Sequence, residues 1–291
     1  MPAAAPAANS APVLTPPLEL PAGLPPEVEA IACDLDRTIL ARGAQLEPQL
    51  IAAIAAAQER GIHVVIATGR MFRSVRPLAL EAGLSGPIVC YQGALVAEAE
   101  SGRFLLHAPM SVEIAREAIE ALAEESYSPN VYVNDEMYVA DHTAASNRYA
   151  STQSIGVREV GDLIDWLREP PTKLVVVGDP DHLDEVKLRM RRRFDGRLFI
   201  SKSLAYFLEF AAHGVTKGSG LAFVADTLGF ALERTIAFGD GENDIELLDV
   251  AGFGVAVDEA DPSLAPVTDW SVPPPEELGV ARAIEALLAR T

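Results

Sequence analysis

The chain is short of positive charge, and this shortage narrows the partners that it can bind. Lys and Arg number 23 against 42 Asp and Glu, which gives a formal net charge of −19 over 291 residues. Such an excess of acid argues against general nucleic-acid binding and against adhesion to anionic membranes. An anionic small molecule would need a locally positive pocket, formed by a metal ion, basic side chains or helix N-termini.

Cysteine is almost absent, and no apolar run reaches the length of a membrane span. Cys33 and Cys90 lie in apolar, strand-like runs without zinc-ligand spacing, so we interpret them as reduced core thiols. The first 30 residues contain no Lys or Arg and are interrupted by proline, unlike a secretory signal. We therefore expect a cytoplasmic protein with no membrane and no nucleic-acid partner, and the oligomeric state is left open.

The composition is otherwise that of a globular protein of one or two domains, with 49% hydrophobic residues. Residues 1–26 are rich in Ala and Pro and cannot build a packed core, so we expect a flexible N-terminal lead there. The rest of the chain carries two different patterns of predicted helices and strands.

The first pattern alternates buried strands with helices and flanks a different middle segment. Nearly continuous apolar runs indicate strands that helices cover on both faces, and the alternation predicts a parallel, doubly wound (Rossmann-like) α/β sheet. The strands are expected near 31–33, 62–67, 87–90, 235–238 and 254–257. The helices are expected at 47–60, 71–82 and 216–229, after the 239–244 loop up to residue 251, and from residue 280 onward.

The middle segment has a different order of predicted helices and strands. Paired strands separated by helices predict an α+β module with its own sheet, inserted into the first domain. Its helices are expected at 111–125, 143–151, 161–167 and 181–194, and its strands at 130–133, 137–140, near 157, and at 173–177, 197–200 and 205–210. We therefore expect a core formed by residues 27–92 and 214–291, with an inserted module at 93–213.

Two carboxylates stand at the end of the first predicted strand. Asp34 and Asp36 are two residues apart, so they leave the strand on one face. Two such acids repel each other and need a cation, a shared proton or a turn into water. Alone, this pattern leaves both an active site and a solvated turn open.

Further polar groups follow other strands or open a helix, where a doubly wound sheet gathers its functional residues. With the first pair they form an ordered set: Asp34-x-Asp36-x-Thr38, Thr68-Gly69-Arg70, Lys217, and Gly239-Asp240-Gly241-Glu242-Asn243-Asp244. This set resembles the haloacid dehalogenase-like hydrolases, a superfamily made up largely of phosphatases, and the insert resembles the class IIB cap of the Cof-type subfamily. The resemblance covers nearly everything from residue 30 to the C-terminus.

The resemblance implies a catalytic role for four of these residues. Asp34 would be the nucleophile that forms an aspartyl phosphate, and Asp36 would protonate the leaving alcohol and then activate water. Thr68 would hydrogen-bond a phosphoryl oxygen. Lys217 would neutralise the phosphoryl group and hold Asp34 in its charged form.

The same resemblance implies Mg²⁺, whose octahedral preference suits oxygen ligands, waters and a substrate phosphate. Asp34 and Asp240 would give carboxylate oxygens and Asp36 its backbone carbonyl. Asp244 would support the metal through water or hydrogen bonds, and Asn243 would orient the loop on the substrate side. The other interpretation of this loop is an acidic turn that caps the next helix.

Several neighbouring positions carry open or unusual assignments. Gly69 would serve the turn beside the substrate, and Arg70 would either contact the substrate or pair with an acid. Arg37 stands where many relatives have glycine, so a residue with a Cβ must adopt that turn. Gln92 stands where Cof-type proteins often have asparagine. The basic residues in 187–197 are interpreted as a solvated helix face rather than as a substrate contact.

We therefore predict a Mg²⁺-dependent phosphoric monoester hydrolase whose partner is a small phosphorylated metabolite, sugar phosphates ahead of nucleotides, pyridoxal phosphate and flavin mononucleotide. Within enzymes, the alternative is a dedicated biosynthetic phosphatase for sucrose phosphate or mannosylphosphoglycerate. A non-catalytic phosphometabolite-binding protein and a receiver-like phosphoacceptor module are alternatives from other classes. Neither of these needs a second carboxylate two residues after the first.

Overall fold

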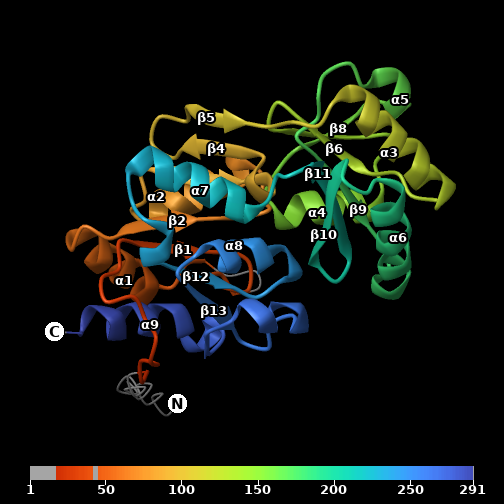
Figure 1. Cartoon of the computed structure of the whole chain (residues 1–291). Coiled ribbons are helices and arrows are strands. Elements are labelled where there is room, and N and C mark those ends of the chain that lie inside the picture. Colours follow the sequence, from red (N-terminus) through yellow and green to blue (C-terminus); the bar gives the residue numbers. More distant parts are fainter. Residues whose placement is uncertain (1–17, 42–44, 291) are drawn as a thin grey trace, which may run out of the picture.

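The computed structural model describes residues 18–41 and 45–290, so the predicted N-terminal lead lies largely outside the described residues. Its central feature is a five-stranded parallel sheet with the order β14-β13-β12-β1-β2 (Figure 1). The strands are β1 (Ala30–Cys33), β2 (His63–Ile66), β12 (Thr235–Gly239), β13 (Phe253–Val257) and β14 (Trp270–Val272). Strands β1, β12 and β13 are buried along their whole length, which explains their uninterrupted apolar sequences.

Helices cover both faces of this sheet, as the doubly wound pattern predicted. The helices are α1 (Pro48–Glu59), α2 (Phe72–Glu81), α7 (Lys217–Leu228), α8 (Ile245–Val250) and α9 (Gly279–Leu288). Helices α1, α2 and α9 share one core with Ile31 and Cys33, whereas α7 and α8 share another with Ala30 and Ala32. Because side chains alternate along a strand, β1 contributes to both cores.

A separate antiparallel sheet flanks β2. It consists of β3 (Pro87–Cys90), β4 (Leu95–Glu98) and β5 (Phe104–His107). We predicted β3 but neither β4 nor β5, and we expected β3 to extend the parallel sheet. It meets that sheet only through an isolated parallel bridge between Ala67 and Val89. In the sequence, the signal for the β4–β5 hairpin was a glycine, Gly102, between two apolar runs. In the structure Gly102 has a positive φ of 74°, which lets the chain reverse there.

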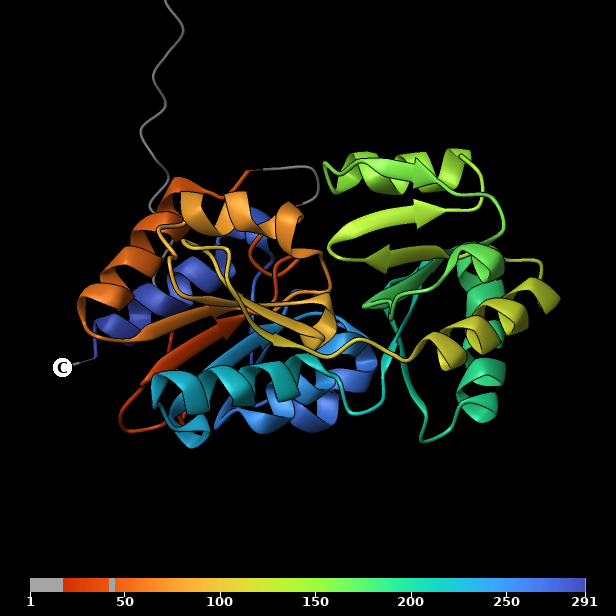
Figure 2. The ribbon, with the colours of Figure 1, turned by 90° about the horizontal axis from the view of Figure 1, so that it is seen from above.

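The middle segment forms a six-stranded sheet with the order β10-β11-β9-β6-β7-β8, as predicted for an α+β insert. Its strands are β6 (Asn130–Val133), β7 (Glu136–Val139), β8 (Val157–Glu159), β9 (Lys173–Val177), β10 (Leu198–Leu204) and β11 (Phe207–Ala212). Its helices are α3 (Val112–Glu124), α4 (Ala144–Thr152), α5 (Leu163–Trp166) and α6 (Pro180–Arg193). Helices α3, α5 and α6 share a core on one face, while Tyr149 and Ala150 of α4 join the core that contains β1. Figure 2 shows this sheet beside the parallel one.

The sheet pairing does not fix where one domain ends and the next begins. The β4–β5 hairpin pairs with β3 although both strands fall in the range 93–213. The division of the chain into a core and an inserted cap therefore stays a proposal. Among the described residues, no helix combines the length and the apolar character that crossing a membrane requires.

Candidate active site

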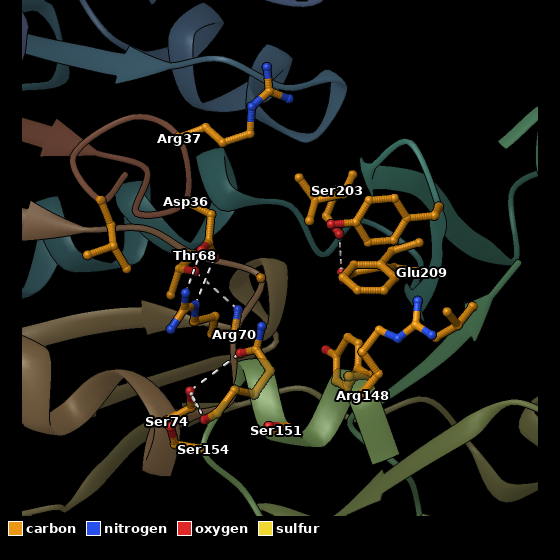
Figure 3. Close-up of a pocket in the computed structure, with 18 of the residues that line it drawn as sticks. Asp36, Arg37, Thr68, Arg70, Ser74, Arg148, Ser151, Ser154, Ser203 and Glu209 are labelled. Carbon is orange, nitrogen blue, oxygen red and sulfur yellow. Dashed lines mark hydrogen bonds and ion pairs between the residues drawn. The ribbon is translucent and has the colours of Figure 1, made fainter. Parts of the chain in front are cut away.

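The carboxyl ends of β1, β2 and β12 meet at one edge of the parallel sheet, because these strands are parallel neighbours. Asp34 follows β1, Thr68 lies just beyond β2, and Asp240 follows β12. With Asp36 and Asn243 they line a cavity of about 1180 Å³, whose wall also includes α4 and the six-stranded sheet (Figure 3). The strand pattern alone predicted this convergence.

Lys217 is the buried cation of the site. It is the first residue of α7, where the Thr216 side chain caps the helix by accepting a hydrogen bond from the backbone N–H of Ser219. Its Nζ lies 2.5 Å from Oδ1 of Asp34 and 2.6 Å from Oδ1 of Asp244. Burial opposes the charge, but the two carboxylates outweigh it and raise the pKa of Lys217. The lysine is therefore held protonated.

Three buried carboxylates surround this lysine. Asp34, Asp240 and Asp244 each offer an oxygen within 4.8 Å of the others. Burial, reinforced by Asp244, raises the pKa of Asp240 to about 7, and burial raises the pKa of Asp34 well above its usual value. Lys217 and Arg37 give two positive charges against three acids, and clustered carboxylate oxygens are the donors that hard divalent cations take. The described residues therefore fit a metal site, although they do not identify the ion.

The loop after β12 is fixed by its own acid. Oδ2 of Asp244 accepts hydrogen bonds from the backbone N–H groups of Asp240 and Gly241, at 3.1 and 3.0 Å. Asn243 of the same loop donates through Nδ2 to Oε1 of Gln92 at 3.0 Å. Asp244 stands at the N-cap of α8, but its side chain makes no capping hydrogen bond to that helix, so the helix-capping interpretation of the loop is wrong.

Asp36 forms an ion pair with Arg70 and is not part of the cluster of buried acids. Nε of Arg70 donates to Oδ2 of Asp36 at 2.8 Å and Nη2 donates to Oδ1 at 2.5 Å, a two-pronged contact. The backbone N–H of Arg70 donates to Oγ1 of Thr68 at 3.1 Å. Of the two alternatives left open for Arg70, this structure has the pairing with acid. The direction of the Asp36 carbonyl toward a metal stays a prediction.

The two departures from the family pattern are accommodated locally. Arg37 adopts a positive φ of 67° and lies 3.4 Å from Asp240, so its charge faces the acidic cluster. Gln92 also has a positive φ of 60° and is fully buried. A Cβ on Gly69 would lie 2.4 Å from Nε2 of Gln92. A side chain at residue 69 would therefore displace the buried Gln92 amide, whereas the φ of Gly69 is not positive and the turn itself does not require glycine.

Sequence analysis missed a buried polar network that joins the two larger sheets. Nζ of Lys173 donates to the carbonyl of Gly69 at 2.6 Å and to Oε2 of Glu209 at 3.0 Å. Glu209 also accepts from Gln92 at 3.0 Å and from Ser203 at 2.5 Å. The only signals were a lysine opening an apolar strand and a glutamate inside another. The buried polar network therefore consists of Lys173, Glu209, Gln92, Ser203 and the Gly69 carbonyl.

The basic residues in 187–197 are largely paired with acids. Lys187 and Arg191 contact the two carboxylate oxygens of Glu242, at 2.9 and 2.8 Å, and so tie α6 to the loop after β12. Arg189, Arg193 and Arg197 pair with glutamates of α3 or its end. None is among the described residues that line the cavity. The substrate-contact alternative is unsupported, and the solvated-face interpretation omitted these ion pairs.

Comparison with known proteins agrees with this geometry. A family profile for haloacid dehalogenase-like hydrolase matches residues 31–284. The pyridoxal phosphate phosphatase YbhA of Escherichia coli is 28% identical over 240 residues, which cover 79% of this chain and 88% of the relative. The 5-amino-6-(5-phospho-D-ribitylamino)uracil phosphatase YitU of Bacillus subtilis is 28% identical over 267 residues, covering 88% and 96%.

A solved structure extends the similarity to the fold. The crystal structure of a haloacid dehalogenase-like hydrolase from Bacteroides thetaiotaomicron matches with a TM-score of 0.78 at 27% identity. The match covers 90% of this chain and 100% of that one. The shared fold therefore extends over most of this chain.

Proposed function

The chain belongs to the haloacid dehalogenase-like hydrolases, whose profile covers residues 31–284, and from this membership we propose that it is a phosphatase that hydrolyses phosphoric monoesters. Both relatives described above are named as phosphatases. The observation that carries the proposal is the buried cluster of Asp34, Lys217, Asp240 and Asp244 beside a large cavity. Binding alone does not need a nucleophile and a general acid beside such a cluster.

The proposed substrate is a small phosphorylated metabolite. Sugar phosphates come first from the family resemblance, and phosphorylated heterocycles come second because the two relatives are named for pyridoxal phosphate and a phosphoribitylaminouracil. The six-stranded sheet and α4 would act as a cap that excludes bulky phosphoproteins and bulk water.

The proposed reaction runs in two displacements. A carboxylate oxygen of Asp34 bonds to phosphorus while the ester P–O bond breaks, and Asp36, which must first leave Arg70 and take up a proton, gives that proton to the leaving alkoxide. Water then bonds to phosphorus, Asp36 takes a proton from it, and the acyl-phosphate bond breaks to return Asp34. Thr68 would position a phosphoryl oxygen, and the protonated Lys217 would favour the charged form of Asp34 against the burial that raises its pKa.

Asp34, Asp240 and Asp244 would hold the divalent cation, which we propose to be Mg²⁺. When bound, it would reduce the repulsion between the attacking carboxylate and the anionic phosphoryl group. Arg37 and Thr38 contact Asp240, so they would set the orientation of one ligand.

The test is phosphate release from a panel of phosphorylated metabolites, with Mg²⁺ and with excess chelator. We expect metal-dependent release by the wild type and none above background by Asp34→Asn or Asp36→Asn. Asp226→Asn makes the same chemical change on an exposed part of α7 and is the matched control. Retained turnover in Asp34→Asn would overturn the nucleophile assignment. Absence of release by folded wild type would favour the phosphometabolite-binding alternative.

A further inference from the structure

One face of α4 lines the cavity opposite the acidic cluster. Ala144, Ala145, Arg148 and Ser151 follow helical spacing and all lie in the cavity wall. The alanines and the serine are small, and Tyr149, which also lines the cavity, is uncharged, so Arg148 is the charged side chain that α4 contributes to the wall. The Thr143 side chain caps the helix, which fixes where the face begins.

Arg148 differs from the other arginines of the cavity in having no partner. Arg70 pairs with Asp36, Arg37 with Asp240, and Arg73 with Asp135. Over residues 18–41 and 45–290, no hydrogen bond or ion pair reaches the Arg148 side chain, and no dashed line reaches it in Figure 3. Arg148 is exposed, so its charge is solvated rather than paired with an acid of this chain.

The acids of the cavity do not need Arg148 for neutralisation. Asp34 contacts Lys217, and Glu209 contacts Lys173. Asp36 and Asp240 have the arginines named above. The positive charge of Arg148 therefore remains available to something that enters the cavity.

Figure 3 places Arg148 across the pocket from Asp36 and Thr68. A monoester with its phosphoryl group at Asp34 would extend its organic end into the space before α4. A guanidinium presents a planar fork of donors that matches carboxylate and phosphate oxygens. The geometry thus supplies a second anion-binding group at a distance from the first.

We propose that the substrate carries a second anionic group, a carboxylate or a second phosphate, and that Arg148 binds it. This inference rests on the proposed phosphatase function and narrows its substrate class to phosphorylated acids and bisphosphates. Arg148 is a specificity residue in this proposal and takes no part in bond making or breaking.

The experiment compares substrates that differ only in the second anion. One pair is 6-phosphogluconate and sorbitol 6-phosphate, and the other is glucose 1,6-bisphosphate and glucose 6-phosphate, with p-nitrophenyl phosphate as a common reference. The readout is the ratio of kcat/KM within each pair, so a general loss of activity cancels. Wild type, Arg148→Gln and Arg148→Lys are compared. Arg192→Gln is the matched control, because that exposed arginine of α6 lies outside the cavity.

We expect the wild type to prefer the doubly anionic member of at least one pair by about 10-fold or more, the range of a charge-assisted hydrogen bond. Arg148→Gln should bring that ratio to about one, Arg148→Lys should keep part of it, and Arg192→Gln should keep all of it. A kcat/KM preference for 6-phosphogluconate alone identifies the second anion as a carboxylate. A preference for glucose 1,6-bisphosphate alone identifies it as a phosphate. Either supports the proposal.

A wild type without preference in either pair, or a preference that survives in Arg148→Gln, overturns the inference while the phosphatase function stands. If the folded wild type releases no phosphate from any probe, p-nitrophenyl phosphate included, the proposed function fails and the inference falls with it.

Discussion

Replacing Lys173 by methionine tests the network that joins the two larger sheets. The lysine is 1% exposed, and its Nζ lies 5.3 and 5.6 Å from the ring centres of Tyr132 and Tyr91. Burial opposes its charge, but Glu209 outweighs burial and raises the pKa of Lys173, so the pair is ionic. Methionine keeps most of the length of the side chain and removes the charge.

The magnitude follows from what the substitution leaves behind. Glu209 is 3% exposed and would keep only the hydrogen bonds from Gln92 and Ser203. An unpaired buried charge costs about 3–5 kcal/mol of unfolding free energy. For a chain of this size, 1 kcal/mol corresponds to roughly 2–4 °C, so Tm should fall by about 6–20 °C. Adding Glu209→Gln removes the stranded charge and should recover about 2 kcal/mol or more.

The assay is a double-mutant cycle over wild type, Lys173→Met, Glu209→Gln and the double variant. Thermal unfolding is followed by circular dichroism and by tryptophan fluorescence, and coincident transitions justify a single unfolding free energy. A coupling free energy of about 2 kcal/mol is expected between the two positions. If Lys173→Met costs less than about 1 kcal/mol, or if the double variant loses the sum of the single losses, the reasoning about a buried ion pair is wrong.

Three other outcomes are expected. Glu242→Gln should cost about 1–2 kcal/mol of unfolding free energy by breaking its contacts with α6, and this difference should shrink in about 1 M NaCl; persistence at high salt would exclude an ionic origin. Gly93→Ala should cost at least about 2 kcal/mol more than Gly61→Ala in urea unfolding, because both have positive φ but only the Gly93 Cβ would lie 2.0 Å from the Thr216 carbonyl oxygen. The raised pKa of Asp240, about 7, means that metal-free protein loses stability as pH rises through that value. Millimolar Mg²⁺ should therefore raise Tm more at about pH 8 than at about pH 5, and an equal rise in Asp240→Asn would contradict this.

The convergence of the acidic site was predictable because it depends on local patterns. Apolar runs identified the strands, parallel order placed their carboxyl ends together, and Asp34, Thr68 and Asp240 follow those ends. The pairing of Lys173 with Glu209 was not predictable in this way. It depends on β9 and β11 being neighbours, although β10 lies between them in the sequence.

Two other features were hidden for related reasons. The ion pair of Arg70 and Asp36 depends on side-chain directions at two strand ends, which spacing along the chain does not fix. That Arg148 has no acid partner can be seen only in the structure, where the nearby acids contact other basic residues. Helix pattern placed this residue on α4 but gave no reason to separate it from other surface arginines.

The position of β1 between β2 and β12 also bears on how the chain is made. Thr38 and Asp240 share a hydrogen bond across 202 positions of sequence, and β12 supplies one whole edge of β1. During synthesis, β1 can pair with β2 early, but its other edge stays open until β12 leaves the ribosome. The six-stranded sheet is complete in sequence before that moment. A nascent chain that stops before Thr235 therefore has an exposed central strand and lacks half of its acidic site.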